Sequence, residues 1–269
     1  MQATSAGPIP NTTAHDNAPN SFGDIMTSAP STGEMSPRTK ARLAGALFLT
    51  TIIGGIVAQE GLAGGLIVGG DAAATANNIM AHQSLFRAAF AVYMVEMSCQ
   101  VAMVAVFYDL FMPVDHSIAR ASAAFGYIGC GIKALSRLFM YAPLFVLGGS
   151  SYLSAFEPKQ LQAISYVLLR INEQGAAIAM VFFAFDTLLK GYLMIRATFL
   201  PKVLGVLGLI SGAGWLAFIY PPLGYALNLP ITLVALVASV ALIGWLIVRG
   251  VDQRKWYETV AASTTSVWR

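Results

Sequence analysis

Two cations lie four residues apart inside a long apolar run of the chain. The run is GIKALSRLFM, and it contains Lys133 and Arg137. Residues four apart share one face of an α-helix, so both cations are expected to point in the same direction. An ionisable side chain at the centre of a membrane costs about 2.5–3.5 kcal/mol on insertion scales, and it therefore normally faces protein or a water-filled cavity. The spacing predicts a polar site inside a helical bundle.

Carboxylates in neighbouring apolar runs are expected to compensate these cations. Glu96 falls near the depth of Arg137 when about 1.5 Å is counted for each helical residue. Asp186 approaches the depth of Lys133, and it can also pair along its own helix with Lys190 at i, i+4. Tyr93 and Ser136 are suited to complete the hydrogen bonding. The predicted polar cavity is lined by Glu96, Gln100, Lys133, Arg137, Asp186 and Lys190.

A structural explanation of the same charges remains open. Buried polar contacts between membrane helices can simply hold neighbouring helices in register, and they average about 0.6 kcal/mol in one measured system. Arg170 and Glu173 are secondary candidates, because they lie at the margin of an apolar run, where a long side chain can reach the membrane surface.

Composition indicates the class of protein. The chain of 269 residues is 57% hydrophobic and only 11% charged, whereas a soluble domain is about a quarter charged. The mean hydropathy is +0.66. The net charge of +3 is small and forms no basic, aromatic-interleaved patch, so no nucleic-acid partner is expected. We expect membrane lipids as partners, while the oligomeric state stays open.

Hydropathy predicts an all-α polytopic membrane bundle of six transmembrane helices. The apolar runs extend over approximately residues 40–62, 85–112, 121–147, 171–195, 203–220 and 231–248. Each approaches or exceeds the length of about 20 residues that a helix needs to cross the hydrocarbon core. Residues 1–37 are predicted to be a disordered tail, residues 38–252 the transmembrane domain and residues 253–269 a second tail.

Two short amphipathic helices are expected outside the membrane. The first covers Asp71 to His82, where Asp71 suits a helix N-cap before AAATANNIM. The second begins at FEPKQLQAI, where Pro158 suits a first helical turn. Basic residues concentrate at the opposite ends of the spans, which predicts that both termini are cytoplasmic. We therefore expect a multi-pass protein of the cytoplasmic (inner) membrane.

Two segments resemble an uncharacterised bacterial membrane family. They are VGGDAAATANNIMAHQSLFR and FFAFDTLLKGYLMIRATFLPKVLGVLG, and the similarity covers about residues 40–250. The family is domain-of-unknown-function family 4386. The resemblance implies a bundle of six membrane helices and brings no established activity.

Two classes of function fit these observations. In the first, the polar cavity binds a lipid, an ion or a small solute. In the alternative, the protein is an intramembrane enzyme that acts on a lipid or isoprenoid substrate, with Glu96 or Asp186 as the general acid or base. The sequence contains no GxxxxGK[ST], HExxH, GxSxG or GxGxxG motif. We therefore expect no cofactor and no metal, and the catalytic residues of the alternative are unknown.

Overall fold

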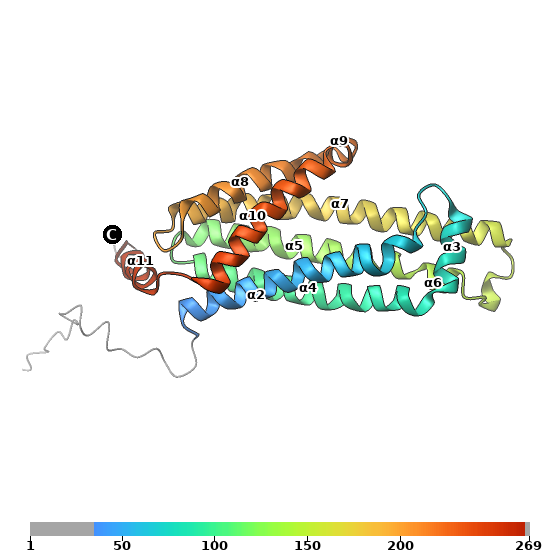
Figure 1. Ribbon diagram of the computed structural model, residues 1–269, viewed down its shortest axis with the longest axis horizontal. Helices are drawn as coiled ribbons and strands as arrows, with labels where there is room; N and C mark the ends of the chain where they lie inside the picture. The colour runs from blue at the N-terminus through green and yellow to red at the C-terminus, as the bar shows by residue number, and fades with distance from the viewer. Residues whose placement is uncertain (1–34, 267–269) are drawn as a thin grey trace, which may run out of the picture. The chain divides into compact units, whose positions relative to one another are not determined.

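The computed structural model describes residues 35–266, and within this range all regular elements are helices. Figure 1 shows the long helices running alongside one another, with the short helices at their ends. In chain order the elements are α2 (Pro37–Ile56), η1 (Val57–Ala63, a π-helix), η2 (Gly64–Leu66), α3 (Ala72–Ala81), α4 (Gln83–Phe111), α5 (His116–Tyr141), α6 (Pro143–Val146), η3 (Ser151–Leu153), α7 (Pro158–Arg196), α8 (Lys202–Trp215), η4 (Leu216–Ile219), α9 (Pro221–Ala226), α10 (Asn228–Val248) and α11 (Gln253–Ser266).

Several helices begin at the residues that local chemistry favours. The Asp71 side chain accepts a hydrogen bond from the Ala74 backbone N–H, which confirms the predicted N-cap of α3. Pro158 is the first residue of α7, also as predicted. The Asp115 side chain caps α5 in the same way as Asp71 caps α3. These caps satisfy backbone N–H groups that have no partner within the first helical turn.

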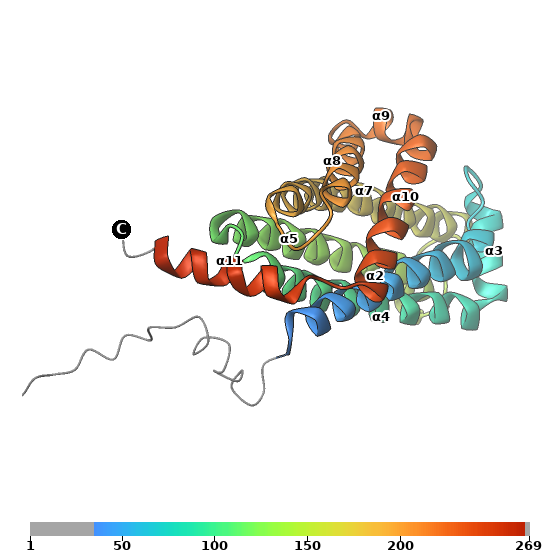
Figure 2. The ribbon, with the colours of Figure 1, turned by 60° about the vertical axis from the view of Figure 1, so that its left-hand side comes forward.

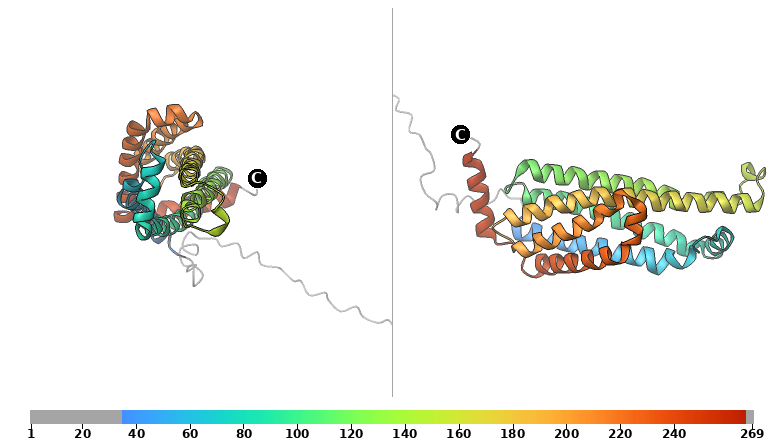
Figure 3. Two further views of the ribbon diagram at one scale, coloured as in Figure 1. Left: turned by 90° about the vertical axis from the view of Figure 1, so that its right-hand side faces the viewer. Right: turned by 90° about the horizontal axis from the view of Figure 1, so that it is seen from above.

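Six helices form a closed ring within residues 35–266. Neighbours in the ring are also neighbours in the chain: α2 packs on α4, α4 on α5, α5 on α7, α7 on α8 and α8 on α10. The last helix, α10, then packs against the first, α2. Figure 3 (left) shows this arrangement nearly end on. A side chain that points away from lipid therefore points either at a neighbouring helix or into the middle of the ring.

Five of these helices are long and apolar enough to cross a membrane, counting only the described residues. They are Pro37–Leu66, Gln83–Phe111, Pro158–Arg196, Lys202–Ile219 and Asn228–Val248. The chain is thus a multi-pass membrane protein. The remaining member of the ring, α5, has 26 residues and packs between α4 and α7, but it carries Lys133 and Arg137 and has no stretch apolar enough to be counted with these five. The expected six spans are reached only if α5 also crosses the membrane.

The second short amphipathic helix is not a separate element. Residues 158–196 form one helix of 39 residues, which spans about 58 Å at 1.5 Å per residue. The hydrocarbon core is about 30 Å thick, so α7 extends well beyond it. The first expected short helix forms as α3, whereas the expectation of a separate second one was wrong. No proline follows Pro158 within the segment, and Gly175 packs against Ser136 without interrupting the helix.

The structure describes most of the second predicted tail but little of the first. Residues 1–34 lie outside the described residues, while Ser36 already caps α2. The second tail is helical: α11 lies at the end of the ring where α2 begins and α10 ends (Figure 2). The indole N–H of Trp256 in α11 donates to the Leu110 carbonyl at 3.0 Å. We call this end of the ring the α11 end, and the opposite end, which carries α3, the α3 end.

Glycine allows α7 and α8 to approach closely. A Cβ added to Gly205 would lie 2.6 Å from the Gly191 carbonyl oxygen and 2.9 Å from the Ile195 nitrogen. Both are backbone atoms, so neither can move without separating the two helices. Close contact between small residues is a common way to hold helices together in a membrane, where lipid is as apolar as the helices themselves.

Gly205→Ala is expected to separate α7 from α8 and to lower the free energy of unfolding by about 1–3 kcal/mol, as overpacking does. Denaturant unfolding of the purified protein in one detergent measures the change. Gly244→Ala on α10 is the matched control, because its added Cβ would meet nothing within 4 Å. Equal stability of the two variants would contradict this account of α7 and α8.

Candidate functional site

Lys133 joins two polar side chains of α4. Its Nζ lies 2.7 Å from Glu96 Oε1 and donates a second hydrogen bond to Gln100 Oε1 at 3.3 Å. Glu96 and Gln100 are one turn apart on α4, so the ammonium lies between them in height. The Glu96 side chain is 1% exposed and that of Lys133 is 11% exposed. We call these three residues the Glu96 cluster.

One atom of the Glu96 cluster has no partner among the described residues. Glu96 Oε1 accepts from Lys133, whereas Glu96 Oε2 is buried and accepts no hydrogen bond. Buried polar atoms are nearly always hydrogen-bonded, and leaving one without a partner costs about 1–3 kcal/mol, more for a charged group. The cluster therefore has capacity for one more hydrogen-bond donor.

Arg137 points into the bundle as predicted, but its partners are uncharged. Its guanidinium lies 3.7 Å from the centre of the Tyr93 ring on α4, a cation–π contact. It also donates to Asn172 Oδ1 on α7 at 3.1 Å. No ion pair joins Arg137 to Glu96 within the described part of the chain. The expected pairing was wrong by one helical turn, because Lys133 takes the position beside Glu96.

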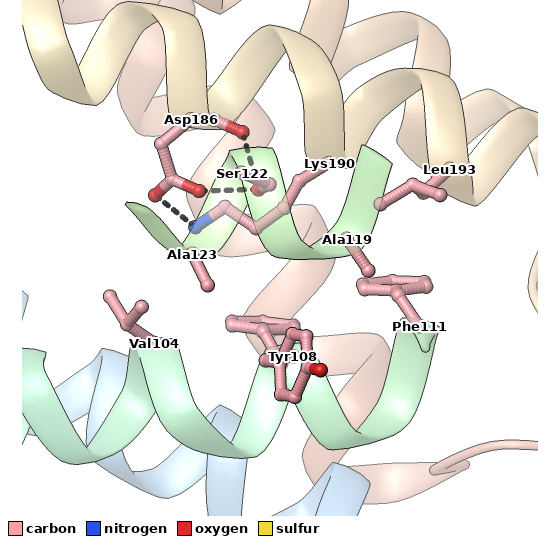
Figure 4. A pocket seen from close by; sticks show the side chains of 10 residues that line it. Val104, Tyr108, Phe111, Ala119, Ser122, Ala123, Asp186, Lys190 and Leu193 are labelled. Carbon is pink, nitrogen blue, oxygen red and sulfur yellow. Dashed lines mark hydrogen bonds and ion pairs between the residues drawn. The ribbon is translucent and has the colours of Figure 1, made fainter. Parts of the chain in front are cut away.

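Asp186 belongs to a second group of polar residues. Its Oδ2 lies 2.7 Å from Lys190 Nζ, one turn away on α7, as predicted. Its Oδ1 accepts a hydrogen bond from Ser122 on α5 at 2.6 Å. Figure 4 shows both contacts beside a space of about 10 Å³, the size of one water molecule. We call Ser122, Asp186 and Lys190 the Asp186 cluster.

The packing of α5 on α7 keeps the two clusters apart. Asp186 lies opposite Ser122, which precedes Lys133 by eleven residues on α5, or about 16 Å along the helix axis. Among residues 35–266, accordingly, no ion pair joins Asp186 to Lys133. The single four-charge network predicted from the sequence is therefore replaced by two clusters and a separate arginine.

Both clusters contribute to the wall of one cavity within the ring. Its volume is about 490 Å³, it is partly open, and every helix of the ring contributes at least one lining residue. Small-molecule sites typically occupy about 300–1,000 Å³. The ionisable residues of the lining are Glu60, Glu96, Lys133, Asp186 and Lys190. Most other lining residues are apolar, including Ile52, Phe183 and Leu242. Arg137 is not part of this lining.

Among the lining residues that sequence reasoning missed are two long polar side chains, Gln59 and Glu60, besides several serines and threonines. Both are on η1, the π-helical continuation of α2, and both are exposed. The Tyr93 hydroxyl donates to Gln59 Oε1 at 2.5 Å. Single π-helical turns inside longer helices occur frequently at functional sites. The sequence signal that could have identified them is the pair of adjacent polar residues near the end of the first apolar run. Polar residues at such a position are typical of the membrane–water interface, so the pair did not stand out.

The remaining candidates lie outside the cavity. Arg170 and Glu173 form an ion pair with each other on one face of α7, and both are substantially exposed. Exposed pairs of this kind contribute little to stability. Within the described residues, His, Cys, Asp and Glu side chains form no group of three that could hold a metal ion.

A ring of apolar helices with paired charges inside it defines a multi-pass membrane protein with an internal polar region. The chain belongs to a family described as a domain of unknown function (DUF4386), whose model matches residues 43–250. No curated protein and no solved structure matches the chain.

Lys133→Met is expected to lower the free energy of unfolding by about 3–5 kcal/mol, because it leaves the Glu96 carboxylate buried without its counter-charge. Adding Glu96→Gln removes the stranded charge, so the double variant is expected to recover part of the loss. Unfolding of the wild type, both single variants and the double variant in one detergent measures the coupling between the two residues.

Arg170→Met is the matched control for this cycle, because it breaks an exposed ion pair of the same bundle. Its expected cost is below about 1 kcal/mol. If Lys133→Met costs no more than this control, the Glu96–Lys133 contact does not stabilise the bundle.

Proposed function

We propose that this membrane protein binds a lipid, an ion or a small solute in the cavity within the ring. The observation that carries the proposal is the buried Glu96 Oε2 atom, which has no partner among the described residues although it belongs to a cavity-lining side chain. This oxygen is closed off from the cavity in the present conformation. A ligand that donates a hydrogen bond would satisfy it once the Glu96 side chain rotates toward the cavity, and would so remove the cost of its burial.

The composition of the cavity wall supports binding as well. Polar groups of the two clusters are set among apolar side chains, which is the usual pattern of a small-molecule site: a mostly apolar wall with a few convergent polar groups. A purely structural ion pair would need neither a cavity of about 490 Å³ nor a carboxylate oxygen without a partner.

The alternative of an intramembrane enzyme has less support. Asp186 has both carboxylate oxygens engaged, one by Ser122 and one by Lys190. Glu96 is left as the candidate general base, because its Oε2 has no partner among the described residues. Binding and proton transfer would use this oxygen equally well, so the geometry that supports binding identifies no reaction.

We also propose that the α11 end faces the cytoplasm and that the membrane is the cytoplasmic (inner) one. Positive residues favour the cytoplasmic ends of membrane helices. Those at or next to the α11 end are Arg38, Lys40, Arg42, Arg120, Arg196, Lys202, Arg249, Arg254 and Lys255. Those toward the α3 end are Arg87, Lys159 and Arg170.

Gly55→Leu is expected to displace the ligand with which the wild type is purified. Gly55 lines the cavity, and a Cβ at this position would meet nothing within 4 Å, so a leucine side chain would enter the space that the ligand needs. Native mass spectrometry of both proteins, extracted in the same mild detergent, is expected to show at least about a tenfold loss of the ligand-bound fraction in the variant.

Gly244→Leu is the matched control for Gly55→Leu. Gly244 also has open space at its Cβ, but it does not line the cavity. This control is expected to keep the ligand-bound fraction of the wild type. Equal retention by both variants, or no bound ligand in the wild type, would contradict the proposed function.

Cysteine labelling tests the orientation. Lys159→Cys places an exposed thiol near the start of α7, toward the α3 end, and Ser117→Cys places one near the start of α5. A membrane-impermeant maleimide is expected to label the first variant in intact cells and the second only after permeabilisation. The wild type, with Cys99 and Cys130 in membrane helices, measures the background. The reverse pattern would place the α11 end outside.

A further inference from the structure

Carboxylates outnumber ammonium groups in the cavity lining. The lining contains Glu60, Glu96 and Asp186 against Lys133 and Lys190, so the formal charge is three negative and two positive, or −1. The cavity lining predicted from the sequence contained three cations, Lys133, Arg137 and Lys190, against two carboxylates, a formal excess of one positive charge. The structure excludes Arg137 from the lining and adds Glu60, which reverses the sign of the excess.

The position of the excess charge is also informative. Each lysine of the lining lies 2.7 Å from a carboxylate oxygen. Glu60 forms no ion pair with another described residue, and it is exposed on η1. Deeper in the bundle, the buried Glu96 Oε2 lacks a hydrogen-bond donor. The unused capacity of the wall is therefore that of a negatively charged acceptor, at Glu60 and again at Glu96.

The rest of the lining suits an apolar chain. Around the polar groups lie side chains such as Ile52, Met180 and Leu236, contributed by three different helices of the ring. A ligand that matches the whole wall must combine an apolar tail with a head group that is positively charged and donates hydrogen bonds.

We propose that the cavity binds an amphiphile with a protonated amine as its head group, an inference that rests on the proposed function of the cavity. The ammonium would donate to Glu96 Oε2 after a rotation of the Glu96 side chain opens this oxygen to the cavity, and its charge would balance the excess carboxylate of the lining. Hydrogen bonds between an ammonium and a carboxylate are about twice as strong as those between neutral groups. A carboxylate head group would instead add a negative charge to a wall that already has one in excess.

Binding of dodecylamine, dodecanol and dodecanoate to the full chain tests the proposal, because these probes differ only in the head group. Native mass spectrometry at neutral pH in a non-ionic detergent gives the three dissociation constants. Dodecylamine is expected to bind at least about tenfold more tightly than dodecanol, and dodecanoate is expected to bind weakest.

Two variants test whether the carboxylates cause the preference for dodecylamine. Glu96→Gln keeps the size of the side chain and removes its charge, and Glu60→Gln does the same at an exposed position, where folding is not at risk. Each is expected to reduce the preference for dodecylamine over dodecanol, Glu96→Gln by about tenfold and Glu60→Gln by about threefold. Glu258→Gln is the control, because Glu258 pairs with Arg254 on α11, away from the cavity lining, and it is expected to leave the preference unchanged.

The outcomes separate this inference from the proposed function. Tighter binding of dodecanoate, equal binding of the probes, or an unchanged preference in either Glu96→Gln or Glu60→Gln would overturn the ammonium ligand. Displacement of the native ligand by Gly55→Leu would still support a binding cavity. Failure of all three probes to bind, together with equal ligand retention in Gly55→Leu and wild type, would overturn both.

Discussion

The fold depends on one constraint: an ionisable side chain within an apolar helix must face other protein groups rather than lipid. Lys133 satisfies this constraint by reaching across to α4, where Glu96 and Gln100 receive its ammonium group. One turn farther along α5, Arg137 lies against the ring of Tyr93, which is also on α4. These contacts allow only a narrow range of axial positions of α5 relative to α4. The polar groups therefore set the register of helices whose apolar surfaces would fit together in many ways.

Small residues face these polar groups and make room for them. A Cβ added to Gly54 of α2 would lie 3.2 Å from Glu96 Cβ, and one added to Gly126 would lie 3.2 Å from Asp186 Oδ2. A Cβ added to Gly175 of α7 would lie 2.7 Å from Ser136 Cβ. Glycine lets the helices approach until side-chain hydrogen bonds can form between them. Close packing and polar pairing consequently reinforce each other at the same heights in the bundle.

Closure of the ring gives these groups a common space. The charged groups of the lining lie on η1, α4, α5 and α7, whereas α8 and α10 add mainly apolar lining, and α10 returns to pack on α2. The cavity thus combines charged groups from these four elements with an apolar wall from α8 and α10. The lining has one carboxylate more than it has ammonium groups, because both lysines are paired and Glu60 forms no ion pair with another described residue.

Local properties of the sequence determined the all-helical membrane class, the cap at Asp71 and the inward direction of Lys133 and Arg137, because hydropathy and helical periodicity act over neighbouring residues. Tertiary packing alone decided which partner each charge meets. A register shift of one turn moves a side chain by about 5.4 Å, enough to exchange Arg137 for Lys133 beside Glu96. Nothing in the sequence gives the axial position of one helix relative to the next. The inclusion of Glu60 in the cavity and the exclusion of Arg137 were decided in the same way, by how helices distant in sequence pack together.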